Sequence, residues 1–295
     1  MSARLYLNGR WLAPQDAQVS VMDRGFLFGD GVYEVIPVYS RRPFRLEQHL
    51  LRLQRSLDAI ALVNPHTLAE WSALVMQMVA EAEWDDQSIY IQVTRGPTVV
   101  RSHAFPLAPQ PTVLLFAEQM NMPSAEQVQN GVAVISAPDI RWLRCDIKST
   151  SLLANCMLRQ LAVDAGCAET VLFRDGVLTE GSASSIFVVR GSVLLAPVKN
   201  HLMLPGITYD VVLELAATHG LPVEVRDISE AEVRTADELW LASSPREVLP
   251  IVVLDDKKVG ADGTAAGKPG PVFAAMYGWY QAFKAEVMRE GRQHG

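Results

Sequence analysis

The sequence predicts a mixed α/β (α+β) protein with two domains. Its 295 residues are enough to bury a large core, and more than one domain is expected at that length. Runs with strand alternation are interspersed with runs at helical spacing along the chain. Between Gln119 and Asn130 this periodicity is lost, and Pro and polar residues become more frequent. We therefore expect an N-terminal domain over residues 1–120 and a C-terminal domain over residues 125–295.

Composition and charge exclude several classes of protein. The chain is 49% hydrophobic and 20% charged, which is an ordinary globular composition. Its net charge is −7, and no run of Lys and Arg is long enough to bind a nucleic-acid backbone. The apolar runs are too short to span a membrane, and the N-terminus lacks the hydrophobic core of a signal peptide. We therefore expect neither a nucleic acid nor a membrane as a partner.

The cysteine pattern fits a reducing compartment. Cys145, Cys156 and Cys167 are too few to suggest a disulfide framework. The chain contains neither a Cys-x-x-Cys nor a His-Glu-x-x-His motif, so no metal site is predicted. These observations favour a cytoplasmic enzyme.

The first domain is expected to begin with a hairpin, because Asn8-Gly9 is a strong turn signal. Gly25, Gly29 and Gly31 then predict a backbone that another segment approaches closely, and their spacing is not that of a dinucleotide-binding loop. Residue periodicity predicts strands at Val32–Val38, Ile89–Arg95 and Val113–Phe116, and helices at Glu47–Ile60 and Leu68–Ala82.

Tyr33 and the loop Gly96–Pro111 carry candidate ligand-binding side chains. Tyr33 follows the glycine-rich stretch and could point into a site, although a tyrosine in a strand more often packs. The loop is long and patternless, as functional loops often are. Arg101 and His103, one residue apart on it, could both reach one carboxylate. The alternative is a mobile surface loop.

The second domain is expected to combine hairpins with helices. A strand at Val132–Ile135 opens it, and a helix with Thr208 as its N-cap is predicted further along. The other predicted elements are hairpins at Val171–Thr179 and Ile186–Leu195, a strand at Leu239–Ala242 and a last helix from Pro271 to about Glu290.

Lys148 lies near the centre of the stretch DIRWLRCDIKSTSLLANCMLRQLA, at residues 139–162. Apolar residues precede it, and the hydroxyl residues at 149–151 are typical of a helix N-terminus. A cation is unfavourable there, because the helix dipole is positive at that end. A lysine in such a setting loses its proton more easily, and a neutral amine is a nucleophile. The alternative is a surface lysine whose stem packs on apolar residues.

Two other stretches predict polar contacts with a ligand. Glu180 ends a strand and is followed by five small residues, which is typical of a backbone packed close to a ligand. Gly206-Ile207-Thr208 offers N–H groups and a hydroxyl at a helix N-terminus, which suits an anion. Arg52 and Ser243-Ser244 could add to that anion site. The alternatives are a plain turn and ordinary helix capping.

Together these features match the requirements of pyridoxal phosphate (PLP). A lysine forms a Schiff base with this cofactor, and an acid keeps a proton on its pyridine nitrogen. N–H groups and hydroxyls bind its phosphate. Lys148, Glu180 and the predicted anion site supply one of each.

Seven motifs, spread over nearly the whole chain, carry a family resemblance. They are DRGFLFGDGVYEV (23–35), His49-Leu-Leu-Arg52-Leu53, VTRG (93–96), RSHAFP (101–106), DIRWLRCDIKS (139–149), LTEGSASS (178–185) and GITYDVV (206–212). With these motifs the chain resembles the fold-type IV PLP aminotransferases, and within them the D-amino acid transaminases. The most specific matches are the block ending in Lys148-Ser149 and the Arg101-x-His103 pair.

The resemblance implies an architecture and an assembly. The N-terminal domain is expected to be a small two-layer α/β structure that contributes residues binding the substrate carboxylate and the phosphate. The C-terminal domain is expected to be a larger pseudo-barrel that binds PLP. The resemblance also implies a homodimer with shared active sites, in which the loop with Arg101 and His103 reaches the partner's site.

The resemblance further implies a role for each matched residue. Lys148 becomes the Schiff-base lysine and proton carrier, and Glu180 the partner of the pyridine nitrogen. The implied phosphate ligands are Arg52, the Ile207 N–H, Thr208, Ser243 and Ser244. The implied carboxylate ligands are Tyr33, Arg101 and His103.

Three residues near the implied cofactor site depart from the family pattern. Ser185 stands where Asn is common, and Pro205 where a flexible or basic residue is expected. Tyr209 replaces an expected basic residue. These departures bear on cofactor affinity rather than on reaction type.

The implied activity is a ping-pong transfer of an amino group between a D-amino acid and a 2-oxo acid. Alternatives within the family are branched-chain L-amino acid aminotransferase, aminodeoxychorismate lyase and (R)-amine transaminase. An amine transaminase accepts substrates without a carboxylate, so the set of Tyr33, Arg101 and His103 argues against it. Outside enzymes, the alternatives are a PLP-binding protein without turnover and a hydrophobic ligand-binding protein.

Overall fold

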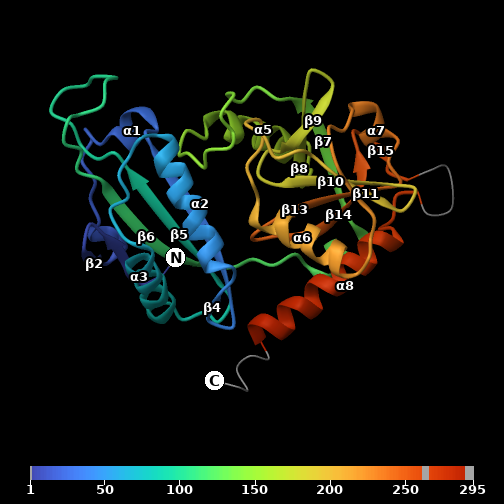
Figure 1. Ribbon diagram of the computed structural model, residues 1–295, viewed down its shortest axis with the longest axis horizontal. Coiled ribbons are helices and arrows are strands. Elements are labelled where there is room, and N and C mark those ends of the chain that lie inside the picture. The colour runs from blue at the N-terminus through green and yellow to red at the C-terminus, as the bar shows by residue number, and fades with distance from the viewer. Residues whose placement is uncertain (1, 261–265, 290–295) are drawn as a thin grey trace. The chain divides into compact units, whose positions relative to one another are not determined.

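A computed structural model describes residues 2–260 and 266–289, and Figure 1 shows its elements. Its contacts divide the chain into two compact units. Of the described residues, the first unit takes those up to Met120 together with Ile147–Leu152. The second takes Asn121–Asp146 and those from Leu153 onward. Ile147–Leu152 thus packs with the first unit, although it lies within the range 125–295 expected for the second domain.

The first unit has two layers, a sheet and a pair of helices, as predicted. Its six strands run in the order β2-β1-β6-β5-β3-β4, and every neighbouring pair is antiparallel. Helices α2 (Leu46–Ala59) and α3 (Leu68–Glu81) lie against this sheet (Figure 1). The strands are β1 (Leu5–Leu7), β2 (Arg10–Leu12), β3 (Gly31–Tyr39), β4 (Arg42–Pro43), β5 (Gln87–Thr94) and β6 (Thr112–Gln119).

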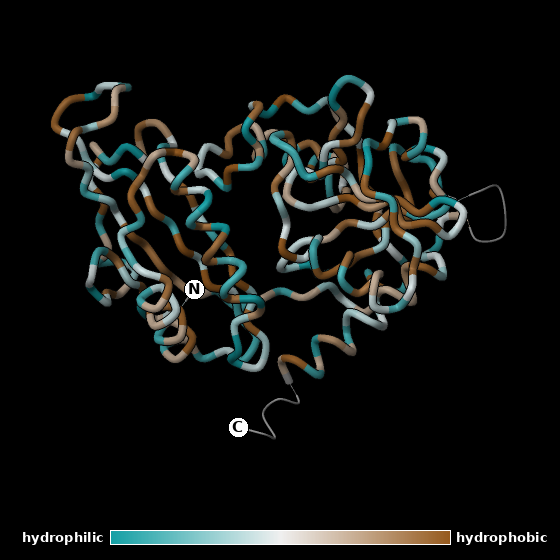
Figure 2. Tube along the Cα trace, viewed as in Figure 1, coloured by the Kyte–Doolittle hydropathy of each residue, from teal (hydrophilic) through white to brown (hydrophobic). Residues whose placement is uncertain are grey.

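The core of the first unit lies between its helices and its sheet. Leu50, Leu53 and Leu57 recur at helical spacing on α2, and all three are buried. They belong to one hydrophobic cluster with Ile36 of β3 and Ile89 of β5. Figure 2 shows the hydrophobic colour concentrated along the strands. The helix predicted at Glu47–Ile60 is therefore present, and these leucines lie on its buried face.

The first 30 residues contain one predicted turn and two helices that the sequence analysis missed. Asn8 and Gly9 have φ values of 48° and 85°, and β1 and β2 pair around them as predicted. The 3-10 helix η1 (Pro14–Asp16) and the helix α1 (Arg24–Phe28) are too short to show periodicity. Asp23 caps α1 through the Gly25 N–H.

The second unit contains a nine-stranded mixed sheet, which curls into a half-barrel (Figure 1). The strand order is β12-β11-β10-β13-β14-β7-β8-β9, and β15 pairs with β14. The predicted mixed fold with a pseudo-barrel is therefore confirmed. The strands are β7 (Val132–Pro138), β8 (Glu169–Arg174), β9 (Val177–Gly181), β10 (Ser185–Arg190), β11 (Val193–Ala196), β12 (Val223–Val225), β13 (Glu238–Ser243), β14 (Glu247–Leu254) and β15 (Lys257–Lys258).

The helices of the second unit correct three predictions. Helix α5 begins at Leu153, so Lys148 lies five residues before it rather than at its N-terminus. Gly206, not Thr208, is the N-cap of α6. The stretch taken for a patternless boundary contains α4, and the predicted helix end at Glu290 lies outside the described residues. The helices are α4 (Ala125–Asn130), α5 (Leu153–Asp164), α6 (Ile207–Thr218), α7 (Glu230–Arg234), α8 (Pro271–Lys284) and the π-helix η2 (Ala285–Arg289).

Two other findings concern the whole described chain. Within residues 2–260 and 266–289, no helix is both long enough and apolar enough to cross a membrane. The three cysteines are free thiols, and Cys145 is the buried one among them.

Candidate active site

Backbone hydrogen bonds hold Lys148 in place within the first unit. Its carbonyl accepts a hydrogen bond of 2.9 Å from the Tyr33 N–H, and its own N–H donates to the Ser56 hydroxyl at 3.3 Å. Two residues further on, the Thr150 N–H donates to the Gly31 carbonyl at 3.0 Å. The segment Ile147–Leu152 therefore runs beside the start of β3, and this pairing sets the position of Lys148.

Gly29 makes this close approach possible. It ends α1 with a φ of 66°, a conformation that favours glycine. A Cβ atom at this position would lie 2.6 Å from the Ser151 hydroxyl oxygen and 3.2 Å from the Ser151 Cα. The prediction that the glycine-rich stretch allows close backbone approach is confirmed at this residue.

The side chain of Lys148 is half-buried and lies over an aromatic ring. Its Nζ is 4.2 Å from the centre of the Tyr33 ring, and that ring stacks on Tyr90 at 5.7 Å. The structure records no ion pair for Lys148 among the described residues.

Arg52 belongs to a buried polar cluster that the sequence analysis did not predict. Its Nε and Nη2 donate to the two oxygens of Glu34 at 2.7 and 2.8 Å. His49 contacts the same carboxylate through Nδ1 at 2.9 Å. Glu34 and His49 have 0% exposure, and Arg52 has 3%. The sequence contains a signal for this cluster, because Glu34 shares one face of β3 with the apolar residues Val32 and Ile36.

The cluster fixes the protonation of its members. Burial would raise the pKa of Glu34, but the charge of Arg52 and the hydrogen bonds from Arg52 and His49 outweigh it and keep that pKa well below its usual range. Burial lowers the pKa of His49, against the opposing effect of Glu34. His49 is therefore neutral, with its proton on Nδ1 facing the ionised Glu34. Its Nε2 is buried and finds no hydrogen-bond partner among residues 2–260 and 266–289.

Arg101 and His103 are exposed, and both lie close to α1 in the first unit. The Arg101 guanidinium carbon is 4.9 Å from the centre of the Phe28 ring, and the His103 ring is 5.3 Å from the same ring. One aromatic side chain thus contacts both members of the predicted carboxylate-binding pair.

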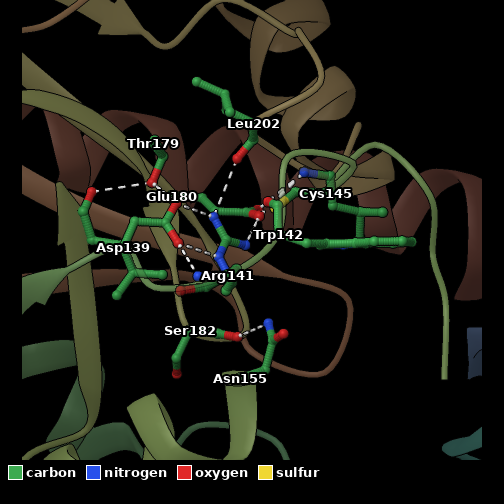
Figure 3. Close-up of polar contacts among 12 residues, drawn as sticks. Asp139, Arg141, Trp142, Cys145, Asn155, Thr179, Glu180, Ser182 and Leu202 are labelled. Atoms are coloured by element: carbon green, nitrogen blue, oxygen red, sulfur yellow. Dashed lines mark hydrogen bonds and ion pairs between the residues drawn. The ribbon is translucent and has the colours of Figure 1, made fainter. Parts of the chain in front are cut away.

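Glu180 lies in the second unit in a network of buried charges (Figure 3). Arg141 donates from Nη1 to Glu180 and from Nη2 to Asp139, the latter at 2.8 Å. The Leu204 N–H also donates to the Glu180 carboxylate, at 3.2 Å. Burial raises the pKa of Glu180, while the charge of Arg141 and the Leu204 N–H oppose that rise. Arg141 and Asp139 are functional candidates that the sequence analysis missed.

The small residues after Glu180 form a turn anchored by a second buried carboxylate. Glu169, which has 0% exposure, accepts hydrogen bonds from the Ser182 N–H at 3.1 Å and from the Ser184 hydroxyl at 2.9 Å. Asn155 on α5 donates to the Ser182 carbonyl at 2.9 Å (Figure 3). The turn is therefore a fixed structure, which sets the direction of Glu180 at the end of β9.

The N-terminus of α6 begins at a residue that has no side chain to cap it. Gly206 is the N-cap, and no capping hydrogen bond from a side chain is found there among the described residues. The first N–H groups of a helix lack intrahelical acceptors, and they suit an anion. A Cβ atom on Gly206 would lie 3.1 Å from the Ser185 hydroxyl oxygen. Pairing of β10 with β13 sets Ser185 opposite Ala242, the residue that directly precedes Ser243-Ser244.

Tyr209 does not belong to this anion site. Its side chain is 1% exposed, stacks on Phe187 at 5.1 Å and donates its hydroxyl to the Pro197 carbonyl at 2.7 Å. At this position, where the family pattern has a basic residue, the chain therefore has a core residue in the first turn of α6.

These residues fit the chemistry of PLP. The first unit offers the amine of Lys148, for which no ion pair is found in the part of the chain that the structure describes. The second unit offers a buried carboxylate, Glu180, and an uncapped helix N-terminus with a glycine at its N-cap. These features match the requirements of the aldehyde, the pyridine nitrogen and the phosphate in turn.

Comparisons with known proteins place this chain in a family. Residues 31–254 match the family model of the class IV amino-transferases. The D-alanine aminotransferase of Bacillus licheniformis is 37% identical, over 91% of this chain and 93% of that protein. The D-alanine aminotransferase of Listeria monocytogenes serotype 4b (strain F2365) is also 37% identical, over 97% and 96%.

The chain belongs to the class IV aminotransferases.

Solved structures agree with this assignment. The branched-chain amino acid aminotransferase of Escherichia coli has a TM-score of 0.88 at 23% identity, covering 98% of this chain and 95% of that one, a likeness in fold alone. The branched-chain aminotransferase of Thermoproteus uzoniensis, solved with norvaline, has a TM-score of 0.84 at 26% identity, covering 98% and 97%. The predicted family and fold class are therefore confirmed.

Class IV aminotransferases are PLP-dependent enzymes. This chain is thus an aminotransferase of a PLP-dependent family, as its sequence predicts.

Proposed function

We propose that this class IV aminotransferase transfers an amino group between a D-amino acid and a 2-oxo acid, with PLP as its cofactor. The observation that carries this proposal is the 37% identity to D-alanine aminotransferases over 91% and 97% of the chain. The combination of Tyr33, Arg101 and His103 supports it, because these side chains suit a substrate carboxylate.

The cofactor contacts are assigned residue by residue. Lys148 would hold the cofactor covalently, and Glu180 would keep its ring nitrogen protonated. The phosphate ligands are Arg52, the N–H of Ile207, Thr208, Ser243 and Ser244. Arg52 is held for this role by Glu34, which engages two of its nitrogens.

The reaction then depends on proton transfer by Lys148. Bound PLP supplies an electron sink for the charge that develops at the substrate Cα. Lys148 Nζ would take the proton from the substrate Cα and hold it for the return transfer. Arg101 and His103 bind the substrate carboxylate, and this orientation decides which face of Cα lies towards Lys148. A second half-reaction with a 2-oxo acid runs the same transfers in reverse.

The assembly is also a proposal. We infer a homodimer with shared sites, in which Arg101 and His103 of one subunit bind the carboxylate of a substrate held at Lys148 of the other. The predicted cytoplasmic location stays a prediction.

Branched-chain L-amino acid aminotransferase is the second candidate, because the solved structures cited above share the fold of this chain at TM-scores of 0.88 and 0.84. Aminodeoxychorismate lyase and (R)-amine transaminase stay as further alternatives. A PLP-binding protein without turnover is the non-enzymatic alternative.

Bleaching of the cofactor absorbance separates these candidates. The holoenzyme is mixed with D- or L-alanine, glutamate or leucine, or with a simple chiral amine, and the spectrum is recorded. We expect the D-amino acids to convert the cofactor to its amino form. A response confined to the L-series would contradict the D-specific proposal, and no response to any amine would favour a protein without turnover.

A further inference from the structure

Arg24 binds the backbone of the loop that carries Arg101 and His103. It lies at the start of α1 and is 3% exposed. Its Nη1 donates to the carbonyls of Ser102 at 2.5 Å and Ala104 at 3.2 Å, and its Nη2 donates to that of His103 at 3.2 Å. Three successive carbonyls are thus bound by one guanidinium, whose planar set of donors a lysine cannot reproduce.

Asp30 fixes this guanidinium from the other side. Its Oδ2 accepts from Arg24 Nε at 2.7 Å and from Arg95 Nε at 2.9 Å. Arg95 in turn lies 3.6 Å from the centre of the Phe105 ring, further along the same loop. Burial of two arginines against one carboxylate is costly unless each remaining donor is satisfied. Here the loop carbonyls satisfy Arg24, so the cluster and the loop conformation depend on each other.

Phe28 contacts the side chains of Arg101 and His103, the two predicted carboxylate ligands on this loop. It lies one turn after Arg24 on α1, and the Arg24 guanidinium carbon is 4.9 Å from its ring centre. The Arg101 guanidinium carbon is also 4.9 Å from this ring, and the His103 ring is 5.3 Å away. An aromatic face attracts a guanidinium and stacks with an imidazole. One ring therefore aligns the two exposed side chains.

We propose that Arg24 and Phe28 are positioning residues for the substrate carboxylate. Arg24 fixes the backbone of residues 102–104, and Phe28 sets the directions of Arg101 and His103 before substrate arrives. This inference rests on the proposed function, since it takes Arg101 and His103 as the carboxylate ligands. Neither positioning residue touches the substrate.

The first test uses Arg24→Lys, with Arg41→Lys as its matched control. Arg41 also donates to backbone carbonyls, those of Val79 at 2.6 Å and Ala82 at 3.0 Å, but away from the loop. Single-turnover bleaching of the holoenzyme is followed as a function of D-alanine concentration. For Arg24→Lys we expect the half-saturating concentration to rise about tenfold while the limiting rate stays within about threefold. For Arg41→Lys we expect neither to change.

The second test compares Phe28→Leu with Phe28→Tyr. Leucine keeps an apolar side chain but removes the aromatic face, whereas tyrosine retains it. We expect Phe28→Leu to raise the half-saturating D-alanine concentration about tenfold and Phe28→Tyr to restore the wild-type value. Phe26 is an exposed residue of the same helix, and Phe26→Leu is the control for loss of an aromatic ring.

Limited digestion with trypsin provides a readout that does not depend on turnover. In Arg24→Lys we expect faster cleavage after Arg101, because the carbonyls of Ser102, His103 and Ala104 lose the guanidinium that holds them, with cleavage elsewhere unchanged. An unchanged loop, or an equal effect of Arg41→Lys on half-saturation, would overturn the inference while leaving the proposed function intact. An equal rise in the half-saturating D-alanine concentration in Phe28→Leu and Phe28→Tyr would also overturn the inference and leave the proposed function intact. A wild-type enzyme that no amino acid bleaches would overturn both.

Discussion

At the scale of single residues, the first unit depends on a neutral histidine buried beside a charged pair. His49 donates to Glu34, and Glu34 in turn engages Arg52. A buried polar network of this kind is costly when one member changes its protonation state. The pH dependence of stability should therefore report on it.

We predict that His49 makes the fold less stable as the pH falls. Its pKa in the folded protein is lowered by burial from 6.5, so the unfolded chain takes up a proton first. The free energy of unfolding should fall between about pH 6.5 and pH 5.5 by about 1 kcal/mol more in the wild type than in His49→Gln. Urea unfolding at several pH values measures this, with the exposed His201→Gln as control. Parallel pH profiles for wild type and His49→Gln would refute the assignment.

A second prediction at this scale concerns Arg141 in the other unit. Arg141→Met leaves the buried carboxylates of Asp139 and Glu180 without their shared cation, so the free energy of unfolding should fall by about 3–5 kcal/mol. Arg144, three residues after Arg141, forms an exposed ion pair with Asp146. Arg144→Met should lower the free energy of unfolding by less than about 1 kcal/mol. Equal losses in the two variants, measured by urea unfolding, would contradict the buried network.

Sequence reasoning predicted site roles for residues in unusual local patterns, and it missed the buried residues that contact some of them. Lys148, Glu180 and the Arg101–His103 pair stand out because each breaks a local pattern. Arg141 and Glu169 do not, because an arginine or a glutamate in a loop or strand is ordinary until its partners are known. Those partners lie 39 and 13 residues away along the chain, for Glu180 and Ser182 respectively.

At the scale of elements, the position of Lys148 is set by backbone approach rather than by a helix. The helix-dipole account of this lysine is wrong, since α5 begins five residues later. Instead, Thr150 and Ser151 donate side-chain hydrogen bonds to the Gly29 carbonyl, both at 3.0 Å. Periodicity finds elements, but it does not show where two non-periodic segments meet.

We predict that Gly29→Ala disturbs this contact. The left-handed backbone costs about 1–2 kcal/mol with any side chain, and the added methyl group would also collide with Ser151. Gly9→Ala is the matched control, because Gly9 also has a positive φ, 85°, but has no atom within 4 Å of the new methyl group. Gly29→Ala should be the less stable of the two in thermal unfolding and should retain less cofactor after dialysis. Equal stability and equal retention would count against the contact.

At the scale of the whole molecule, the fold and family could be predicted from the sequence, because the motifs extend over most of the chain. The two-layer first unit and the curled sheet of the second agree with that expectation. Strand order could not be read from the residues, because pairings such as β14 with β7 join segments more than 100 residues apart.

Subunit exchange tests the proposed shared sites. Lys148→Ala and Arg101→Ala should each be inactive, or nearly so, as homodimers. If Arg101 serves the partner's Lys148, a mixed dimer has one intact site, and mixing the two variants under conditions of exchange should restore up to about half of the wild-type rate per mixed dimer. No recovery, with mixed dimers shown by mass spectrometry, would mean that both residues serve the same subunit's site.

The identity of the reactive amine is the central claim. Borohydride reduction of the holoenzyme, followed by proteolysis and mass spectrometry of the peptides, tests it most directly. We predict a single phosphopyridoxyl label on Lys148. A label on another lysine, or none on a protein that retains its yellow colour, would contradict this account.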